Sequence, residues 1–492
     1  MNYPIVFKLL SLITAVVAGA FGLSLCVSIF YSENAIEAGA YEPWITSFAI
    51  ALVMTLIFYL PGRNASTKIF KKEAMCVVGL AWIVCSLIGS CPYVLILNCG
   101  FSDAFFESAS GLTSTGASVF GDVENFPRSV LFWRALSQWI GGLGVVVLFV
   151  ALLSSLGAGA KAIYSRESSL NVADFEFGKI KAATRRVIII YSALSLLCAA
   201  SYMLCGMPAF DSVCHMLCTV STGGFSIKNS SLGAYGNTAA EWVAILFMFV
   251  GGTNFAVVFM AIKGKFKDIW KNSEFKAYVL IVSLVSFGIF LSILDYEHAT
   301  LIGAFHSLTD SVFQVVSVIT STGFATADYQ EWLPLTHVLI FFLLLIGGCS
   351  GSTAGGLKIF RALGIVKISI KDIEKSFRPN VIRPVRINGK VLSAQNARDM
   401  LSYTALYMSA IMLGIIVISA FERDLSFAGT LSSVVSCISN IGPGLAETGP
   451  SQNYGFLNDA SKISLSLLMI MGRLELYAVL ALFMPSLWRR FR

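Results

Sequence analysis

Four short polar loops interrupt the long apolar stretches of this chain, and each holds a glycine beside hydroxyl or amide residues. Glycine tolerates positive φ, which lets successive backbone carbonyls turn toward one axis. Oxygen atoms around such an axis can replace the water shell of a cation, which hydrocarbon alone cannot do. The pattern predicts an ion-binding ring formed by Ser114, Thr115, Gly116, Ser221, Thr222, Gly223, Ser321, Thr322, Gly323, Asn440, Ile441 and Gly442.

Surface turns between helices are the simpler explanation of these glycines. Such turns need neither a short helix before the loop nor Ser or Thr at matched positions, and this chain has both features. Non-helical backbone is tolerated at membrane depth only where protein buries it or where it lines water. We therefore expect the four loops to converge on one path.

Each loop belongs to a longer repeated unit of helix, short helix, polar loop and helix. Asp103, Asp211 and Asp310 lie 12 or 13 residues ahead of the loop glycines. An Asp at this place is predicted to cap the short helix and to complement its dipole. The fourth repeat has Gly429 there, so Thr430 is the weaker expected cap.

Glycine also recurs 24 to 30 residues beyond each loop glycine, inside the long helix that follows. Three of these sites are Gly-Gly pairs, which begin at Gly141, Gly251 and Gly347, and the fourth is Gly472-Arg473. Close packing between helices is the expected reason for glycine at membrane depth.

The composition places the chain in a bilayer. Of its 492 residues, 56% are hydrophobic and only 13% are charged, whereas soluble domains are about one quarter charged. A spanning helix needs roughly 20 apolar residues, and the first run is longer than the apolar core of a signal peptide. We predict ten crossings, at residues 9–31, 44–60, 74–97, 130–156, 187–207, 242–262, 278–294, 335–352, 401–421 and 463–487.

Charge sets the predicted orientation. Basic residues gather at 63–72, 179–186, 263–271, 358–390 and 489–492, and acidic residues gather on the opposite loops. Because Lys and Arg are enriched in short cytoplasmic loops, both termini are expected inside. The net charge of +7 is then a topological signal rather than a nucleic-acid footprint. The basic rim suits anionic lipid or an acidic partner.

Residues 347–356 form a polar, glycine-rich stretch in an expected spanning helix, which disfavours regular helix there. We interpret the stretch as a broken helix whose centre lies across the ion path; the alternative is a kinked helix packed against its neighbours. The residues expected to form this gate are Gly347, Gly348, Gly351, Ser352, Thr353, Gly355 and Gly356.

Arg473 is expected deep in the last helix, where an arginine is costly unless it faces a wet cavity or has a partner. It is predicted to act as a barrier in the ion path, and the alternative is a structural bond to Glu475 or to a loop carbonyl. Arg134 and Asn254 are expected to join helices.

Other chemistry has weaker support in the sequence. Cys214, His215 and Cys218 lack a second ligand pair for zinc, and no Gly-Lys-Ser or Gly-Lys-Thr motif follows a strand. An intramembrane enzyme, such as a lipid-modifying transferase, is the alternative function, but it would need clustered carboxylates or histidines that the predicted helices hardly offer. We therefore expect no enzyme activity.

The residues resemble the potassium transporters of the Trk, Ktr and HKT superfamily, in particular the bacterial TrkH-type subunit, over essentially the whole chain. The extra helix pair at the start also resembles this type. Besides the four loops, the motifs that carry the resemblance are Phe132-Trp133-Arg134, Gln138-Trp139-Ile140-Gly141-Gly142, Gly251-Gly252-Thr253-Asn254-Phe255, the stretch from Gly347 to Lys358, and Gly472-Arg473-Leu474-Glu475.

The resemblance implies an all-α membrane protein in which four pseudo-repeated helix–pore loop–helix units surround a central ion pore. The implied units are an initial helix pair (1–73) and pore repeats at 74–160, 161–264, 265–390 and 391–492. It further implies potassium as the substrate, no cofactor, a homodimer in the bacterial inner membrane, and regulation by a cytosolic TrkA-type nucleotide-binding subunit. Sodium or proton symport and channel-like permeation both remain open.

Overall fold

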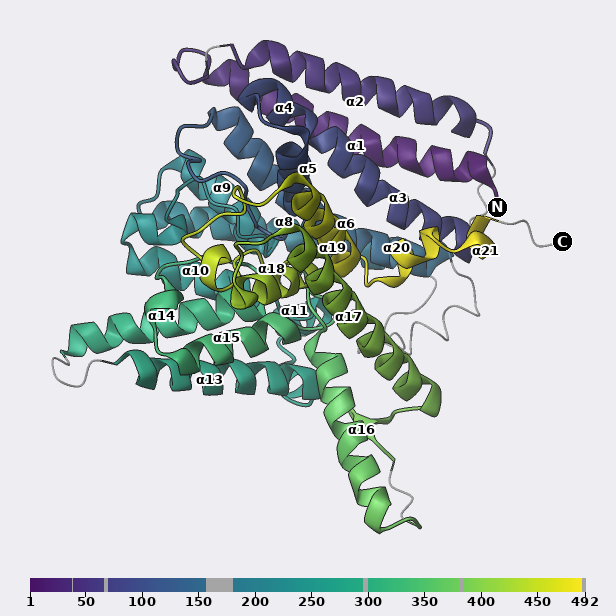
Figure 1. Cartoon of the computed structure of the whole chain (residues 1–492), viewed down its shortest axis with the longest axis vertical. Helices are drawn as coiled ribbons and strands as arrows, with labels where there is room; N and C mark the ends of the chain where they lie inside the picture. The colour runs from purple at the N-terminus through teal and green to yellow at the C-terminus, as the bar shows by residue number, and fades with distance from the viewer. Residues whose placement is uncertain (38, 66–69, 156–179, 295–299, 381–383, 489–492) are drawn as a thin grey trace.

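The computed structural model describes residues 1–37, 39–65, 70–155, 180–294, 300–380 and 384–488 of an all-α membrane protein (Figure 1). The one sheet in these residues is a hairpin of β1 (Arg386–Ile387) and β2 (Lys390–Val391), in which Arg386 pairs with Val391. Several expected features lie outside the described residues, namely the boundary at 160–161 and the basic positions Lys68, Lys179, Arg489, Arg490 and Arg492.

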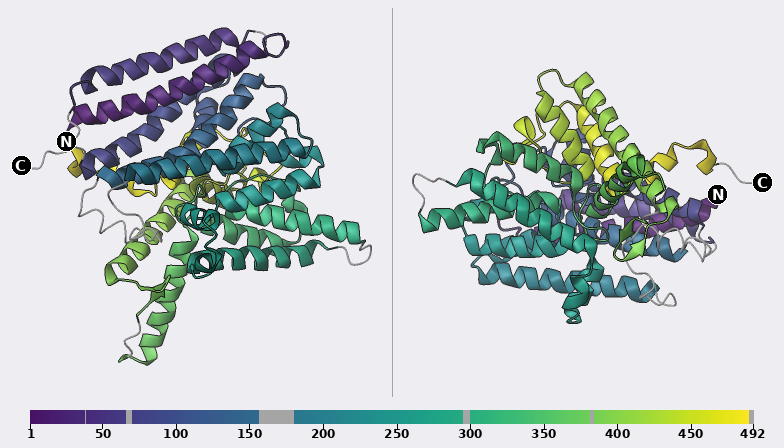
Figure 2. Two further views of the ribbon diagram at one scale, coloured as in Figure 1. Left: turned by 180° about the vertical axis from the view of Figure 1, so that it is seen from behind. Right: turned by 90° about the horizontal axis from the view of Figure 1, so that it is seen from below.

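Two long helices form an edge layer beside the rest of the bundle (Figures 1 and 2). They are α1 (Tyr3–Phe30) and α2 (Tyr41–Gly62), which pack against each other. Indole Nε1 of Trp44 donates to the Ser129 hydroxyl at 2.8 Å, and the Phe21 ring packs on Trp44 and Trp133. These contacts fix the pair to the first repeat.

The remaining helices follow in four groups along the chain. The first group is α3 (Lys71–Gly89), α4 (Cys91–Leu97), α5 (Phe101–Leu112) and α6 (Arg128–Ser155), and the second is α8 (Ile180–Leu204), α9 (Ala209–Val220), η2 (Ser231–Tyr235), α10 (Thr238–Gly251), α11 (Phe255–Ile262) and α12 (Phe266–Ile269). The third group is α13 (Ser273–Ile293), α14 (Leu301–Ile319), η3 (Tyr329–Glu331), α15 (Pro334–Ile346) and α16 (Ile359–Phe377). The fourth group is α17 (Ala394–Phe421), α18 (Phe427–Ser439), η4 (Ala446–Thr448), α19 (Asp459–Arg473), α20 (Tyr477–Leu482) and α21 (Pro485–Trp488).

Seven helical segments in the described part of the chain are long and apolar enough to cross a membrane. They are α1, α2, α3 with α4, α8, α13, α14 and α17, and the bent pair α10 and α11 would make an eighth. The ten expected crossings are therefore not ten continuous helices. Three of them are interrupted by non-helical residues, at Gly252–Asn254, after Ile346 and after Arg473.

The sharpest of these breaks bends α10 and α11 by 109°. The expected single helix at 242–262 is wrong for this reason. The side chain of Asn254 accepts a hydrogen bond from the Ala256 amide at 2.8 Å and so starts a new helix. Asn254 therefore caps the start of α11, in addition to lying between two helices.

The two ends of the described chain lie together. Leu487 of α21 packs with Val6 and Leu10 of α1, and the Lys72 ammonium donates to the Ser486 carbonyl at 3.0 Å. Both ends therefore sit on one side of the helix bundle, as an even number of crossings requires.

The predicted Asp caps are wrong. Asp103 and Asp211 lie in the first turns of α5 and α9 without capping them, where their charge still suits the helix dipole. Asp310 lies inside α14, which starts nine residues earlier at Leu301. In the fourth repeat, Ser426 accepts from the Gly429 amide and caps α18, so Thr430 does not.

Glycines in the long helices bring those helices against the ends of the short ones. A Cβ built on Gly141 would collide with the carbonyl oxygen of Leu112, the last residue of α5, and one on Gly472 would collide with the Ile438 carbonyl near the end of α18. The carbonyl oxygens of Val220 and Ile319, which end α9 and α14, lie farther away, at 3.3 Å and 3.6 Å from a Cβ built on Gly251 and Gly348. The recurring glycines therefore serve close packing.

Replacing Gly141 with Ala should destabilise the protein by about 1–3 kcal/mol, because the methyl group meets backbone that cannot rotate away. Gly144 on the same helix is the matched control, since no heavy atom lies within 4 Å of a Cβ built there. Gly144→Ala should leave stability unchanged or raise it slightly. Thermal unfolding of the two variants in detergent measures the difference, and equal midpoints would contradict the packing role.

Candidate functional site

The four helices that precede the loops, α5, α9, α14 and α18, end with the same backbone geometry, although α14 is longer than the others at 19 residues. One residue becomes left-handed and donates its N–H to the carbonyl three residues back, and the next residue donates to the carbonyl five residues back. This is the Schellman motif, in which glycine is the usual left-handed residue. Here the left-handed residues are Ser114 (φ 52°), Thr222 (φ 53°), Ser321 (φ 54°) and Asn440 (φ 56°).

A left-handed residue with a side chain costs of order 1–3 kcal/mol, so local contacts must hold it. Each of the four side chains makes a hydrogen bond away from its own loop. The bonds are Ser114 Oγ to the Gln138 carbonyl (3.1 Å), Thr222 Oγ1 to Thr353 Oγ1 (3.0 Å), the Gly355 amide to Ser321 Oγ (2.6 Å) and Asn440 Nδ2 to the Met469 carbonyl (2.8 Å).

A left-handed glycine lies two residues after each of these positions. The four are Gly116 (φ 83°), Gly224 (φ 81°), Gly323 (φ 80°) and Gly442 (φ 98°). In the second loop the matched glycine is thus Gly224 rather than the expected Gly223. The Gly223-Gly224 pair hid this register in the sequence, and Ser221, the C-cap of α9, matches Thr113, the C-cap of α5.

The four loops meet in a closed ring. A Cβ built on any of the four left-handed glycines would collide with, or come within 3 Å of, the carbonyl oxygen of an adjacent loop. The glycine and carbonyl pairs are Gly116 with Gly223, Gly224 with Thr322, Gly323 with Ile441, and Gly442 with Thr115. The expected residues therefore converge, with Gly224 added to the set.

A segment of residues 347–358, named the intramembrane segment below, lies against one side of this ring, which we call its inner side. It joins α15 to α16 without helix, and Gly347, Gly351, Gly356 and Lys358 have positive φ. The bonds from Thr222 and Ser321 reach Thr353 and Gly355, and a Cβ on Gly355 would collide with the Ser439 carbonyl. The segment thus contacts three of the four repeats.

Arg473 at the end of α19 connects the same two parts. Its guanidinium donates to the Thr353 carbonyl at 2.6 Å and to Ser114 Oγ at 3.3 Å, and the residue is 5% exposed. Of the two partners expected from the sequence, the loop carbonyl is therefore the one observed. Glu475 instead pairs with Arg361 at 2.7 Å.

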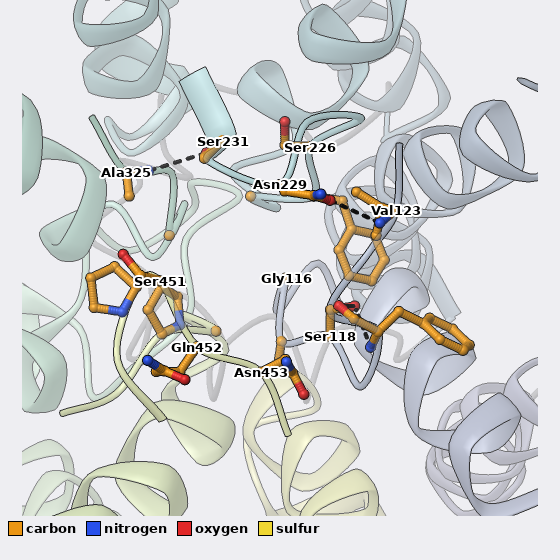
Figure 3. Close-up of a pocket in the computed structure, with 18 of the residues that line it drawn as sticks. Gly116, Ser118, Val123, Ser226, Asn229, Ser231, Ala325, Ser451, Gln452 and Asn453 are labelled. Carbon is orange, nitrogen blue, oxygen red and sulfur yellow. Dashed lines mark hydrogen bonds between the residues drawn. The ribbon is translucent and has the colours of Figure 1, made fainter. Parts of the chain in front are cut away.

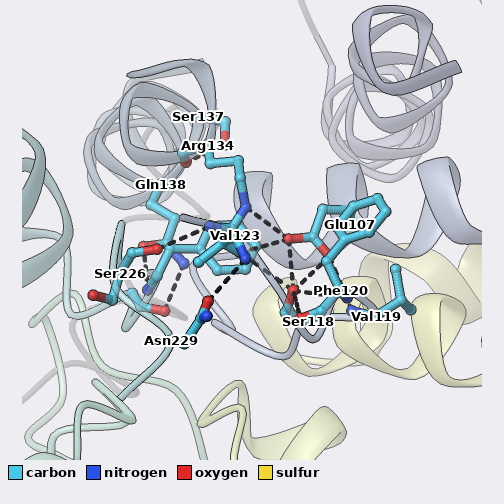
Figure 4. A network of polar contacts seen from close by, with 12 residues as sticks. Glu107, Ser118, Val119, Phe120, Val123, Arg134, Ser137, Gln138, Ser226 and Asn229 are labelled. Carbon is cyan, nitrogen blue, oxygen red and sulfur yellow. Dashed lines mark hydrogen bonds and ion pairs between the residues drawn. The ribbon is translucent and has the colours of Figure 1, made fainter. Parts of the chain in front are cut away.

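A buried ion pair holds the outer side of the first loop (Figure 4). Arg134 of α6 donates to the Glu107 carboxylate of α5 at 2.7–2.8 Å and to the Ser226 carbonyl at 2.9 Å. Glu107 also accepts from the Ser118 hydroxyl and the Val119 amide, both at 3.1 Å. Arg134 thus joins the first two repeats, and sequence reasoning missed its partner Glu107.

Gln138 is a second residue that sequence reasoning missed. Its side-chain amide donates to the Gly223 carbonyl at 2.6 Å and accepts from the Phe225 amide at 3.1 Å. One side chain therefore satisfies backbone groups on both sides of Gly224. The sequence signal was its place at the start of the Gln138-Trp139-Ile140-Gly141-Gly142 motif, one helical turn beyond Arg134.

A cavity of about 120 Å³ opens on the outer side of the ring (Figure 3). Its lining includes the four left-handed glycines together with the side chains of Ser118, Asn229, Gln452 and Asn453. Asn229 also donates to Asp122, and this bond with a second one from Asn125 holds the pKa of Asp122 below its ordinary value. The cavity lining thus combines neutral oxygen groups with the cationic side chains of Arg134 and Lys228, and Asp122 lies between the lining residues Gly121 and Val123 in the sequence.

The inner segment is also connected to the β-hairpin. The Ser350 amide donates to the Glu274 carboxylate at 2.6 Å, near the start of α13. The adjacent Ser273 amide donates to the side chain of Asn388, at the hairpin turn, also at 2.6 Å. Two neighbouring residues of α13 thus hold the hairpin and the segment.

Several spanning helices around re-entrant loops whose carbonyls meet on one path define a multi-pass membrane transport protein. The model of the TrkH family, described as cation transport protein, matches residues 44–490. The chain belongs to this family.

Individual relatives agree over the full length. The chain is 30% identical to the Trk system potassium uptake protein TrkH of Vibrio parahaemolyticus, covering 99% of this chain and 100% of the relative. It is 33% identical to the Trk system potassium uptake protein TrkG of Escherichia coli, covering 94% of each. The crystal structure of the potassium transporter TrkH from Vibrio parahaemolyticus superposes with a TM-score of 0.88 at 28% identity, covering 99% of this chain and 100% of that one.

Replacing Glu107 with Gln should cost about 3–5 kcal/mol, because Arg134 would remain buried without its counter-charge. Glu124→Gln is the control, since its pair with Lys228 is partly exposed and is worth at most about 1 kcal/mol. Denaturant unfolding measures both. Adding Arg134→Met to Glu107→Gln should recover part of the loss; similar losses for Glu107→Gln and Glu124→Gln would contradict the assignment.

Proposed function

We propose that this chain mediates potassium uptake across the cell membrane and that the ring of four loops is its selectivity filter. The carrying observation is the closed contact of each left-handed glycine with the carbonyl of an adjacent loop. The relatives named above are potassium uptake proteins, and family membership makes the enzyme alternative unnecessary.

The filter works by exchanging water for oxygen. Backbone carbonyls of the three matched residues in each loop would surround a dehydrated cation. These are Ser114 to Gly116, Thr222 to Gly224, Ser321 to Gly323 and Asn440 to Gly442. The four short helices end at the ring, and the negative ends of their dipoles favour a cation there.

The membrane potential can drive uptake without a chemical cycle, since it supplies about 2.3 kcal/mol per charge per 100 mV. Reconstituted liposomes loaded with potassium and assayed for rubidium uptake test the function directly. Varying external sodium and pH separates symport with either ion from channel-like flux. Absence of rubidium uptake under every condition, from protein that is folded and inserted, would overturn the proposal.

The register of the second loop gives a sharper test of the filter. Gly224→Ala should reduce potassium uptake by about tenfold or more, because alanine is strained at positive φ and meets the Thr322 carbonyl. Gly223 is not at positive φ, and the methyl group of Gly223→Ala meets the Gln138 side chain rather than backbone. The loss in this variant should be smaller. A larger loss for Gly223→Ala would favour the register read from sequence alone.

The gate in this proposal is the intramembrane segment, which would have to leave its contacts with the ring for ions to pass. Gly355→Ala should loosen it, because a methyl group there meets the Ser439 carbonyl. Single-channel or flux recordings should show altered open probability with an unchanged ratio of potassium to sodium. A changed ratio at constant open probability would place Gly355 in the filter instead.

Arg473 is proposed as an electrostatic barrier beneath the filter. A charge at about 5 Å and an effective dielectric of about 20 repels a cation by about 3 kcal/mol. Arg473→Ala should therefore raise flux, by up to about 100-fold. Arg473→Lys keeps the charge and should remain slow. If both variants raise flux equally, the bond to the Thr353 carbonyl rather than the charge is responsible.

Regulation by a cytosolic TrkA-type nucleotide-binding subunit completes the proposal, with the chain as a homodimer in the bacterial inner membrane and its termini inside. The contacts from the β-hairpin through Ser273 and Glu274 to Ser350 offer a short mechanical connection to the gate. Adding the partner with its nucleotide to the liposome assay tests this role, and an unchanged rate would argue against it.

A further inference from the structure

A second cavity lies apart from the ring, on the same outer side. Its volume is about 420 Å³, and it is enclosed by the turn after α1, the start of α6, the start of α9 and the loop after α9. The residues used below, Glu37, Arg128, Glu124, Asp211, Phe210 and Lys228, all line it. None of the proposed filter or gate residues does.

Glu37 contributes a buried carboxylate to this cavity. The residue is 2% exposed, and its Oε2 accepts only the Ser129 amide, at 3.4 Å. Its Oε1 is buried and has no hydrogen-bond partner among the described residues. A buried carboxylate oxygen without a partner is costly, and such groups are normally satisfied by a donor. Because Glu37 lines the cavity, a ligand bound there is a candidate source of the missing donor.

Arg128 contributes a cation to the same space. Its guanidinium carbon lies 4.5 Å from the centre of the Tyr31 ring and 5.5 Å from that of Phe210. Within the described residues, no carboxylate lies within ion-pair distance of it. Arg128 is exposed, and the two rings hold its guanidinium by cation–π contact while its N–H donors stay open to water or to an anion.

The other charges that line the cavity already have partners. Lys228 pairs with Glu124 at 3.3 Å, and Glu124 also accepts the Asn229 amide at 3.1 Å. The Tyr235 hydroxyl donates to Asp211 at 2.7 Å. Among the described residues that line the cavity, one cation and one carboxylate oxygen have no such partner, and they do not pair with each other although Ser129, which binds Glu37, directly follows Arg128.

We propose that this cavity binds a zwitterion that carries an ammonium group and an anionic group, with the ammonium on Glu37 and the anion on Arg128. The headgroup of phosphatidylethanolamine has this chemistry. The surrounding surface is apolar, since Phe30, Ile36 and Leu204 are exposed near the same ends of α1 and α8, with Leu204 at 89%. Acyl chains could therefore extend beside the occupied cavity, whereas a free zwitterion would use the cavity alone.

Native mass spectrometry of the full-length protein tests the site with phosphatidylethanolamine and phosphatidylcholine. Both lipids carry phosphate, but the trimethylated nitrogen of phosphatidylcholine cannot donate to Glu37. The wild type should retain phosphatidylethanolamine about tenfold better, as one charge-assisted hydrogen bond would give. Equal retention of the two lipids would overturn the proposal, and this comparison needs no variant.

Variants then assign the two groups. Glu37→Gln should remove the preference between the lipids, and Arg128→Gln should weaken retention of both. Glu33→Gln and Arg423→Gln remove exposed charges that do not line the cavity, and they should behave as wild type. Loss of the preference in Glu33→Gln as well, or its survival in Glu37→Gln, would overturn the assignment to Glu37.

Free O-phosphoethanolamine separates the two sources of the headgroup. If it displaces the lipid and raises the thermal midpoint of delipidated protein, the site takes a soluble zwitterion, and the lipid part of the proposal fails while its chemistry stands. If only the diacyl lipid binds, the membrane supplies the ligand. Neither readout depends on ion flux, so the result is independent of the function proposed above.

Discussion

The architecture depends on four chain reversals at membrane depth, where no bulk water can satisfy the backbone. Each short helix must end, turn and leave with its amides bonded, and the Schellman bonds at Ser114, Thr222, Ser321 and Asn440 achieve this from within. The turn exposes carbonyls to the neighbouring loop, and only glycine allows that loop to approach. Ring closure therefore rests mainly on backbone contacts, with one side-chain bond between adjacent loops, from Asn440 Nδ2 to Thr115 Oγ1 at 3.0 Å.

The left-handed positions explain why the ring and the segment beneath it behave as one assembly. Glycine would relieve the strain at these positions but would offer no side chain. Ser, Thr and Asn instead reach inward, to Gln138, Thr353, Gly355 and Met469. The bonds from Thr222 and Ser321 hold the segment, so movement of the segment would remove the bonds that offset the strain in the second and third loops.

The sequence predicted the features that composition alone determines. Five glycines in residues 347–356 excluded helix, and a loop carbonyl was one of the two partners expected for Arg473. The register of the second loop was not predictable, because Gly223 and Gly224 are chemically identical in sequence and only φ distinguishes them. The Asp caps failed because the helices start earlier than expected: α5 and α9 begin two residues before Asp103 and Asp211, and α14 begins nine residues before Asp310.

The break between α10 and α11 was unexpected because its cause lies in another repeat. A broken helix leaves carbonyls and amides unsatisfied. The Gly252 and Gly251 carbonyls accept from the amides of Cys349 and Thr353, and the Phe255 amide donates to the Gly351 carbonyl. The α10–α11 break and the intramembrane segment therefore supply each other's missing hydrogen-bond partners. A continuous α10–α11 helix would leave the intramembrane segment with unpaired amides, so the bend and the segment depend on each other.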